Sequence, residues 1–315
     1  MRTALVGYCL VGPLVGVSDS FPTFFVAFMM WGAFQGALDV SMNAQAIAVE
    51  GDSGRKLMAG FHGSWSMGAL AGAGVGALGV GLGWTLSDQL LLLAVPCLFV
   101  VGWFTTRMIP DQPDVAACAL DTRRRGHKAT FQGAIIVLGM IAFADMLCEG
   151  AVADWAAVYL RGSLHVTAAI AGLGYVAYLL TMMTVRLLGN RVVTRFPVRF
   201  VLPTMAVVAI IGFAAGLAVD RPVGVLAGYC CLGAGLGLVI PCAFSASGHL
   251  RDVNAGRAVA IVSACGWFGF VLGPPLIGEL ATMTSLRTAL YLLPLLTTVI
   301  AVATAKAKAL RVEWG

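Results

Sequence analysis

The chain has 315 residues, of which 59% are hydrophobic and only 11% are charged, and its mean hydropathy is +0.90. Soluble globular proteins carry about a quarter charged residues, so this composition excludes that class and indicates a polytopic membrane protein. The net charge of +5 requires no nucleic-acid partner, because basic residues beside membrane spans mark topology and face anionic lipid.

Apolar runs of roughly the 20 residues needed to cross a bilayer recur about ten times along the chain. The first run follows Arg2 but has no small-x-small cleavage site after it, so we interpret it as a retained helix and not as a signal peptide. The sequence therefore predicts an all-α polytopic fold with spans at approximately 2–18, 22–47, 57–82, 88–108, 131–160, 168–189, 199–219, 222–248, 256–280 and 286–305.

The Lys and Arg residues separate between the two sides defined by these spans. Of the 20, 17 fall on one side, and only Arg161, Arg221 and Arg287 fall on the other. Short loops rich in positive charge stay in the cytoplasm, so we expect both termini to be cytoplasmic. A wrong number of spans would have mixed the two sides, and the separation therefore also supports ten.

The second predicted span contains a polar stripe within its apolar run. Gln35, Asp39 and Asn43 recur every four residues, which places them along one face of a helix. An ionised carboxylate near mid-bilayer costs about 3 kcal/mol, so this stripe must face protein, water or a solute. A structural contact between helices accounts well for the amides, whereas for Asp39 we favour a functional role.

The third predicted span carries a histidine near its start. His62 lies at roughly the depth of Asn43 in the preceding span, where a protonatable ring near Asp39 would suit a proton relay. A buried structural histidine is an equally good interpretation.

The fifth predicted span is the most acidic. Asp145 and Glu149 share one helix face, whereas Asp154 is turned away from them and lies near the outer interface. Two mid-span acids cost about 5 to 7 kcal/mol and must be sheltered from lipid. Buried carboxyls tend to hold a proton until another charge stabilises the anion, so we hypothesise that Glu149 or Asp39 binds a coupled proton.

The sequence offers no motif for a metal centre, a cofactor or an enzyme. The eight cysteines form no CxxC pair and the four histidines are scattered. The sequence has no GxxxxGK[ST] loop and no HExxH motif, and no GxSxG motif lies on a soluble segment. We therefore expect no catalytic activity, no cofactor and no metal.

The chain contains an internal repeat. Residues 32–67 and 233–269 share glycines, a Gly-Arg pair and a tryptophan at an offset of 201 to 202. With a second unit starting near Phe131, this offset puts the start of the first unit about 70 residues before Met1, so we expect two helices of the first bundle to be absent. The expected organisation is an incomplete four-span bundle at 1–106, a basic cytoplasmic linker at 107–130 and a six-span bundle at 131–315.

Parallel six-span repeats joined by a basic loop resemble the Major Facilitator Superfamily, whose transporters have two such halves around a midplane site. The segment 186–197 is similar to that superfamily's cytoplasmic signature loop G-x-x-x-D-R-x-G-R, with Asn190 where an acid is usual. The sequences DVSMNAQ (39–45) and EGAVADWAAVYLR (149–161) resemble a bacterial subgroup of poorly defined substrate. The resemblance implies a gating or signature-loop role for Arg186, Gly189, Asn190, Arg191 and Arg195.

The function implied by this resemblance is transport of a small solute by alternating access in the bacterial inner membrane, with proton coupling as a hypothesis. The alternative is a truncated, non-transporting remnant or membrane interaction protein, and an in-frame extension upstream of Met1 would argue against it. The sequence names neither the solute, the direction of transport nor the oligomeric state. The residues predicted to line a solute or proton pathway are Gln35, Asp39, Asn43, His62, Asp145 and Glu149.

Overall fold

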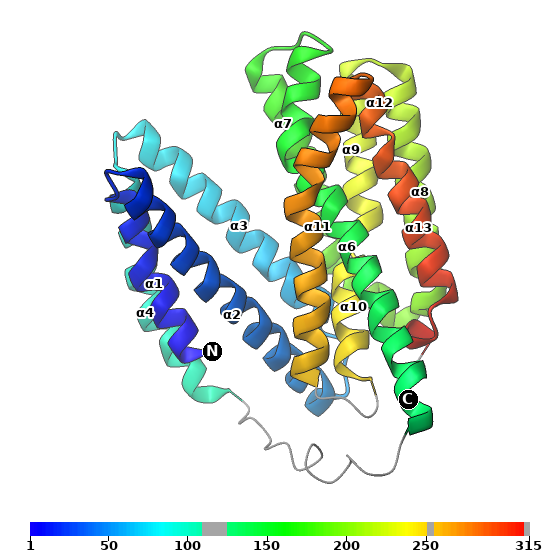
Figure 1. The fold of residues 1–315 in the computed structure, drawn as a ribbon, viewed down its shortest axis with the longest axis horizontal. Helices are drawn as coiled ribbons and strands as arrows, with labels where there is room; N and C mark the ends of the chain where they lie inside the picture. Colours follow the sequence, from blue (N-terminus) through cyan, green and yellow to red (C-terminus); the bar gives the residue numbers. More distant parts are fainter. Residues whose placement is uncertain (109–124, 251–254, 312–315) are drawn as a thin grey trace. The chain divides into compact units, whose positions relative to one another are not determined.

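The computed structural model describes residues 1–108, 125–250 and 255–311 (Figure 1). Every regular element within these ranges is a helix. The chain divides into two compact units, the first comprising residues 1–52 and 67–113 and the second residues 53–66 and 114–315. The second unit therefore includes the start of the third helix as well as the C-terminal part of the chain.

The first unit is built on the pairing of its first and last long helices. Its elements are α1 (Arg2–Gly16), nearly all of α2 (Phe21–Ser53), most of α3 (Met58–Gly81), α4 (Leu86–Phe104) and η1 (Thr105–Arg107). Gly16 of α1 lies against Ser87 of α4, and Tyr8 stacks on Trp31 of α2 with ring centroids 5.3 Å apart. The Arg2 Nη2 donates to the carbonyl of Thr105 at 3.0 Å, which closes one end of the α1–α4 pair.

The second unit is a bundle of longer helices. Its elements are α6 (Arg125–Gly162), α7 (Ala168–Arg195), α8 (Val198–Val219), α9 (Pro222–Leu236), α10 (Val239–Gly248), α11 (Ala255–Met283), α12 (Leu286–Leu290), α13 (Leu292–Lys306) and η2 (Lys308–Arg311). Helix α6 begins inside the segment predicted as a linker, most of which (109–124) lies outside the described residues.

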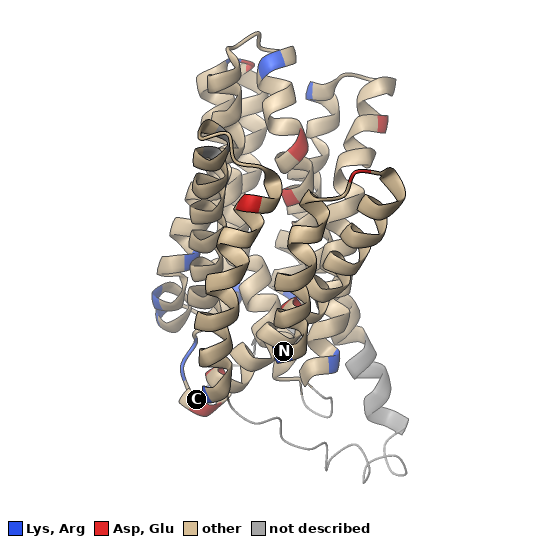
Figure 2. Ribbon diagram, turned by 90° about the vertical axis from the view of Figure 1, so that its left-hand side faces the viewer, with Lys and Arg blue, Asp and Glu red and all other residues tan. Residues whose placement is uncertain are grey.

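The helices confirm a polytopic all-α membrane fold of about ten spans. Charged residues are sparse along the coloured ribbon (Figure 2). The shorter apolar helix α1 and the 24-residue α3 occupy the two predicted spans at 2–18 and 57–82. Among the described residues, eight stretches are long and apolar enough to cross a bilayer by length and composition, namely 21–53, 86–107, 133–162, 168–195, 198–219, 222–248, 255–283 and 286–306.

Two spans that the apolar pattern predicts as continuous are each divided into two helices. The span at 222–248 is interrupted between α9 and α10, and the span at 286–305 between α12 and α13. Each interruption lies about one turn before a proline, Pro241 or Pro294. Proline has no N–H to donate to the carbonyl four residues earlier, and its ring crowds that carbonyl, so the helix is broken there.

Helices α6 and α11 of the second unit are brought close together by glycines. A β-carbon at Gly150 of α6 would overlap the carbonyl of Phe270, and one at Gly269 of α11 would overlap the carbonyl of Phe143. Small residues that allow backbones to approach in this way are the usual basis of helix association in membranes.

We expect Gly150→Ala to lower the unfolding midpoint of the purified protein, because the added methyl group meets backbone that cannot move aside. Overpacking of this kind costs about 1 to 3 kcal/mol. Gly133→Ala is the matched control on the same helix, since no atom lies within 4 Å of a β-carbon placed there. Equal thermal stability of the two variants would contradict the close approach of α6 and α11.

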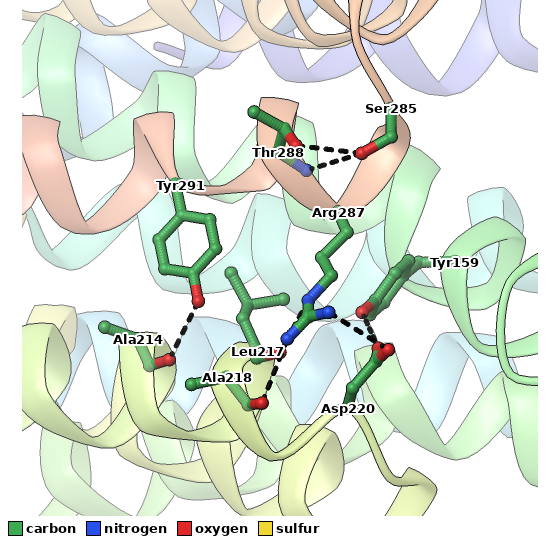
Figure 3. A network of polar contacts seen from close by, with 9 residues as sticks. All are labelled: Tyr159, Ala214, Leu217, Ala218, Asp220, Ser285, Arg287, Thr288 and Tyr291. Carbon is green, nitrogen blue, oxygen red and sulfur yellow. Dashed lines mark hydrogen bonds and ion pairs between the residues drawn. The ribbon is translucent and has the colours of Figure 1, made fainter.

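A polar network joins three helices at one end of the second unit (Figure 3). Arg287 of α12 donates from Nε to the carbonyl of Leu217 and from Nη2 to that of Ala218, both at 2.9 Å. Its Nη1 lies 3.1 Å from the Asp220 carboxylate, which also accepts the Tyr159 hydroxyl at 2.8 Å. The guanidinium thereby satisfies carbonyls that the C-terminus of α8 leaves without helical donors.

We expect Arg287→Ala to destabilise the purified protein by about 1 kcal/mol, mainly through the two carbonyls that lose their donor. The ion pair with Asp220 adds little, because both side chains are about two-fifths exposed and such pairs are screened. The exposed Arg161 provides a control, Arg161→Ala. Arg287→Lys keeps the positive charge but has a single donor nitrogen. Equal thermal stability of Arg287→Lys and the wild type would contradict the proposal that two separate N–H groups are needed for the two carbonyls.

Candidate functional site

Two acids lie at the centre of the second unit on α6. Asp145 is 0% exposed and Glu149 is 7% exposed, one helical turn further on. Neither carboxylate oxygen of Asp145 has a hydrogen-bond partner among the described residues. The sequence predicts both acids on one sheltered helix face, and the structure places them there.

Arg186 of α7 supplies the nearest positive charge. Its side chain is buried on the same stripe of α7 as Tyr178 and Met182. The Nη2 lies 3.9 Å from Oε2 of Glu149, an ion pair that is too long for a hydrogen bond. The Nη1 donates to the hydroxyl of Ser66 at 3.1 Å. The guanidinium of Arg186 is therefore the nearest positive charge to a cluster that contains two carboxylates.

The third nitrogen of Arg186 binds the interruption between α9 and α10. Its Nε donates to the carbonyl of Gly237 at 3.1 Å, and this contact is buried. In a continuous helix that carbonyl would accept from residue 241, which is proline and has no N–H. Arg186 thus replaces the missing helical donor.

The predicted signature loop at 186–197, whose first four residues also end the predicted span at 168–189, is helical as far as Arg195. Hydropathy falls after Leu188 although the helix continues, so the apolar run ends before the helix does. Gly189 lies against Ala59 and Leu238, while Arg191 and Arg195 are exposed.

The last turns of α7 contact the start of α3. The Asn190 Oδ1 accepts the backbone N–H of Gly60 at 3.0 Å, and Lys56 Nζ donates to the carbonyl of Val193 at 2.9 Å. The N–H groups in the first turn of a helix have no helical acceptor. Asn190 therefore caps α3 from another helix.

His62 belongs to the second unit by its contacts. Its ring stacks on Phe244 of α10, with centroids 5.6 Å apart and planes 28° apart. The Nε2 is buried without a hydrogen-bond partner among the described residues. Within the second unit, the structure thus groups His62 with α10.

The polar stripe of α2 lies in the first unit. Asn43 is buried, and its Nδ2 donates to the Asp39 carbonyl at 2.9 Å and to the Asp39 Oδ1 at 3.2 Å. Gln35 lies one turn earlier and is half-buried. The amide of the stripe therefore supports its carboxylate along a single helix face, as the spacing predicts.

Three members of the buried cluster were not predicted as such. Arg186 is predicted near the end of the sixth span, at the start of the signature segment, without a contact to Glu149, and the sequence predicts no role for Ser66 or the Gly237 carbonyl. A signal for the carbonyl is present in the sequence, because a proline at position 241 frees the carbonyl of residue 237 in any helix. Only the fold shows which donor reaches it.

Comparison with known proteins decides the family. The Major Facilitator Superfamily profile matches residues 135–310, more than half of the chain. The chain belongs to this superfamily. Among relatives, an uncharacterized transporter of this superfamily from Yersinia pestis is 30% identical over 89% of this chain and 71% of its own length. The membrane protein MosC of Rhizobium meliloti is 32% identical over 88% of this chain and 66% of its own length.

Solved structures show the same superfamily fold. FucP in its outward conformation aligns with a TM-score of 0.78 at 16% identity, over 96% of this chain and 81% of that chain. The human organic anion transporter MFSD10 aligns with a TM-score of 0.74 at 14% identity, over 96% of this chain and 76% of that chain. Members of this superfamily are transporters and not enzymes, and the family supports a membrane transporter for this multi-span chain.

We expect Arg186→Met to destabilise the protein strongly, because it leaves Glu149 without its counter-charge in a buried site. Loss of one partner of a buried pair costs about 3 to 5 kcal/mol. Adding Glu149→Gln to Arg186→Met should restore part of this loss, as measured by thermal unfolding. The control Arg191→Met changes an exposed arginine of the same helix. Additive effects of the two substitutions would show that the two side chains are not coupled.

Proposed function

We propose that this superfamily member moves a small solute by alternating access and that its movement is coupled to protons. The supporting observation is the buried cluster in which Asp145 and Glu149 share the single guanidinium of Arg186. With both acids ionised the cluster carries one uncompensated negative charge. A proton or a cationic group of the solute is the natural partner for that charge, since an unpaired carboxylate in a buried site is costly.

The proton-binding residues we propose are Glu149 and Asp145 in the second unit and Asp39 in the first. Glu149 lies beside Arg186, so binding and release of its proton change the charge next to the guanidinium. Asp39 has an amide neighbour on its own helix, which can donate to the carboxylate when the proton has left. Gln35, Asn43 and His62 complete the polar groups that we propose to line the pathway.

The orientation we propose places both termini in the cytoplasm of a bacterial inner membrane. Its basis is the 17 to 3 distribution of Lys and Arg between the two sides. On this orientation the end of α7 and the start of α3 lie at the cytoplasmic face. We propose that their contact, through Asn190 and Gly60, is part of a cytoplasmic gate.

Reconstitution into liposomes that contain the pH-sensitive dye pyranine tests the proposed coupling. Neutral sugars, organic carboxylates and amines are added in turn under an imposed pH gradient. We expect at least one class to change the internal pH in vesicles that carry the protein and not in empty vesicles. Glu149→Gln and Asp145→Asn should each abolish that change, because an amide cannot carry the coupled proton.

The matched control is Asp154→Asn, which neutralises an exposed acid of the same helix. We expect it to retain the signal of the wild type. Solute-dependent pH changes that survive Glu149→Gln, Asp145→Asn and Asp39→Asn alike would rule out proton binding at these acids. Uptake of a radiolabelled solute without any pH change would leave transport in place and reject proton coupling.

A further inference from the structure

Helix α9 ends at Leu236 and α10 begins at Val239, so the span that they form is interrupted at Gly237 and Leu238. The first helical bond of α10 runs from the Cys242 N–H to the Leu238 carbonyl at 3.1 Å. The preceding bond, from residue 241 to Gly237, cannot form because of Pro241. In a bilayer an unsatisfied carbonyl costs several kcal/mol, so the interruption needs a donor from elsewhere.

Arg186 supplies this donor and is suited to do so. Its guanidinium is a planar fork with five N–H groups, and it reaches Gly237, Ser66 and Glu149 through three different nitrogens. The approach is close because α9 lies directly against α7. A β-carbon at Gly233 would overlap the carbonyl of Tyr178, and one at Gly237 would lie 3.2 Å from that of Met182.

We propose that Arg186 is a positioning residue that holds the α9–α10 interruption in place and transmits the charge of Glu149 to it. The inference rests on the transport site proposed above, of which Glu149 is a member. An ionised Glu149 holds the guanidinium over the Gly237 carbonyl, and a neutral Glu149 leaves it held by two hydrogen bonds alone. The carbonyl then loses its donor more often, and the start of α10 opens.

Among the described residues, Arg186 is the cation that lies within ion-pair distance of Glu149, at 3.9 Å. His62 of α3 is a further ionisable group close to Arg186. Asp145 lies on the same helix, and Tyr175 and Tyr178 face Glu149 from α7. None of these three carries a positive charge in any state. A change in the charge of Glu149 therefore acts directly on Arg186, which is bound to the interruption.

Hydrogen–deuterium exchange of the purified full chain measures this opening without any knowledge of the solute. The readout is the exchange rate of peptides covering 237–243, and peptides from 198–219 in α8 report on global unfolding. The test uses a Glu149→Gln background, so that Arg186→Met creates no unpaired buried carboxylate at Glu149. Methionine resembles the aliphatic part of the arginine side chain and has no N–H donor, so Arg186→Met removes the hydrogen bond to the Gly237 carbonyl.

In that background we expect Arg186→Met to raise exchange at 237–243 about tenfold, the factor that corresponds to a loss of about 1.4 kcal/mol. Pro241→Ala restores the missing backbone N–H, so with it present the same substitution should raise exchange by less than about twofold. If Arg186 had only a general structural role, Pro241→Ala would not reduce the effect of Arg186→Met on exchange. An equal effect of Arg186→Met with and without Pro241→Ala would overturn the assignment.

The link to Glu149 is tested in the otherwise unchanged protein. Glu149→Gln should raise exchange at 237–243 but leave 198–219 unchanged, while the control Asp154→Asn should change neither. No change with Glu149→Gln would refute the transmission of charge. These outcomes do not depend on transport, so a failure of the pyranine experiment and a failure of this proposal remain distinguishable.

Discussion

The carbonyl of Gly237 has no donor in its own helix, and much of the polar interior follows from this. Hydrocarbon offers no water to satisfy a freed carbonyl, so the protein must supply a donor. The donor is the guanidinium of Arg186, which brings a positive charge into a buried site. A buried cation in turn requires an anion, which Glu149 provides at 3.9 Å. One proline thus accounts for a guanidinium and a carboxylate inside the bundle.

This sequence of requirements is met only because the helices lie close together. Arg186 spans α6, α7, α9 and the start of α3, a reach that one side chain can make only over short separations. A glycine provides the separation between α9 and α7, because a β-carbon at Gly233 would overlap the carbonyl of Tyr178. In lipid there is no hydrophobic force between helices, so close contact of small residues supplies the attraction. The close packing that stabilises the bundle therefore also allows the side chain of Arg186 to contact groups on several helices.

Much of this fold could be predicted from hydropathy, because a bilayer imposes a length and a composition on every span. The pairing of Asp145 with Glu149 on one face followed from helical periodicity alone. The contacts of Arg186 did not, because its position lies within the predicted span at 168–189 but only the packed helices show that its side chain reaches Glu149 and Gly237. Ser66 and Gly237 were missed for a different reason. A hydroxyl carries no sequence signal, and Pro241 indicates that the Gly237 carbonyl is free but not which donor binds it. Only tertiary packing brings both groups to Arg186.

Asn190 shows how a departure from the family pattern can fit the proposed cycle. The superfamily signature has an acid at this position, and an ionised carboxylate at a helix N-terminus gains from both the hydrogen bond and the helix dipole. The asparagine here accepts the same N–H of Gly60 with a neutral oxygen. Charge-assisted hydrogen bonds are roughly twice as strong as neutral ones, so this cap costs less to break. In an alternating-access cycle the contact between α3 and α7 must form and break at every turnover, and a weaker cap lowers the barrier to opening.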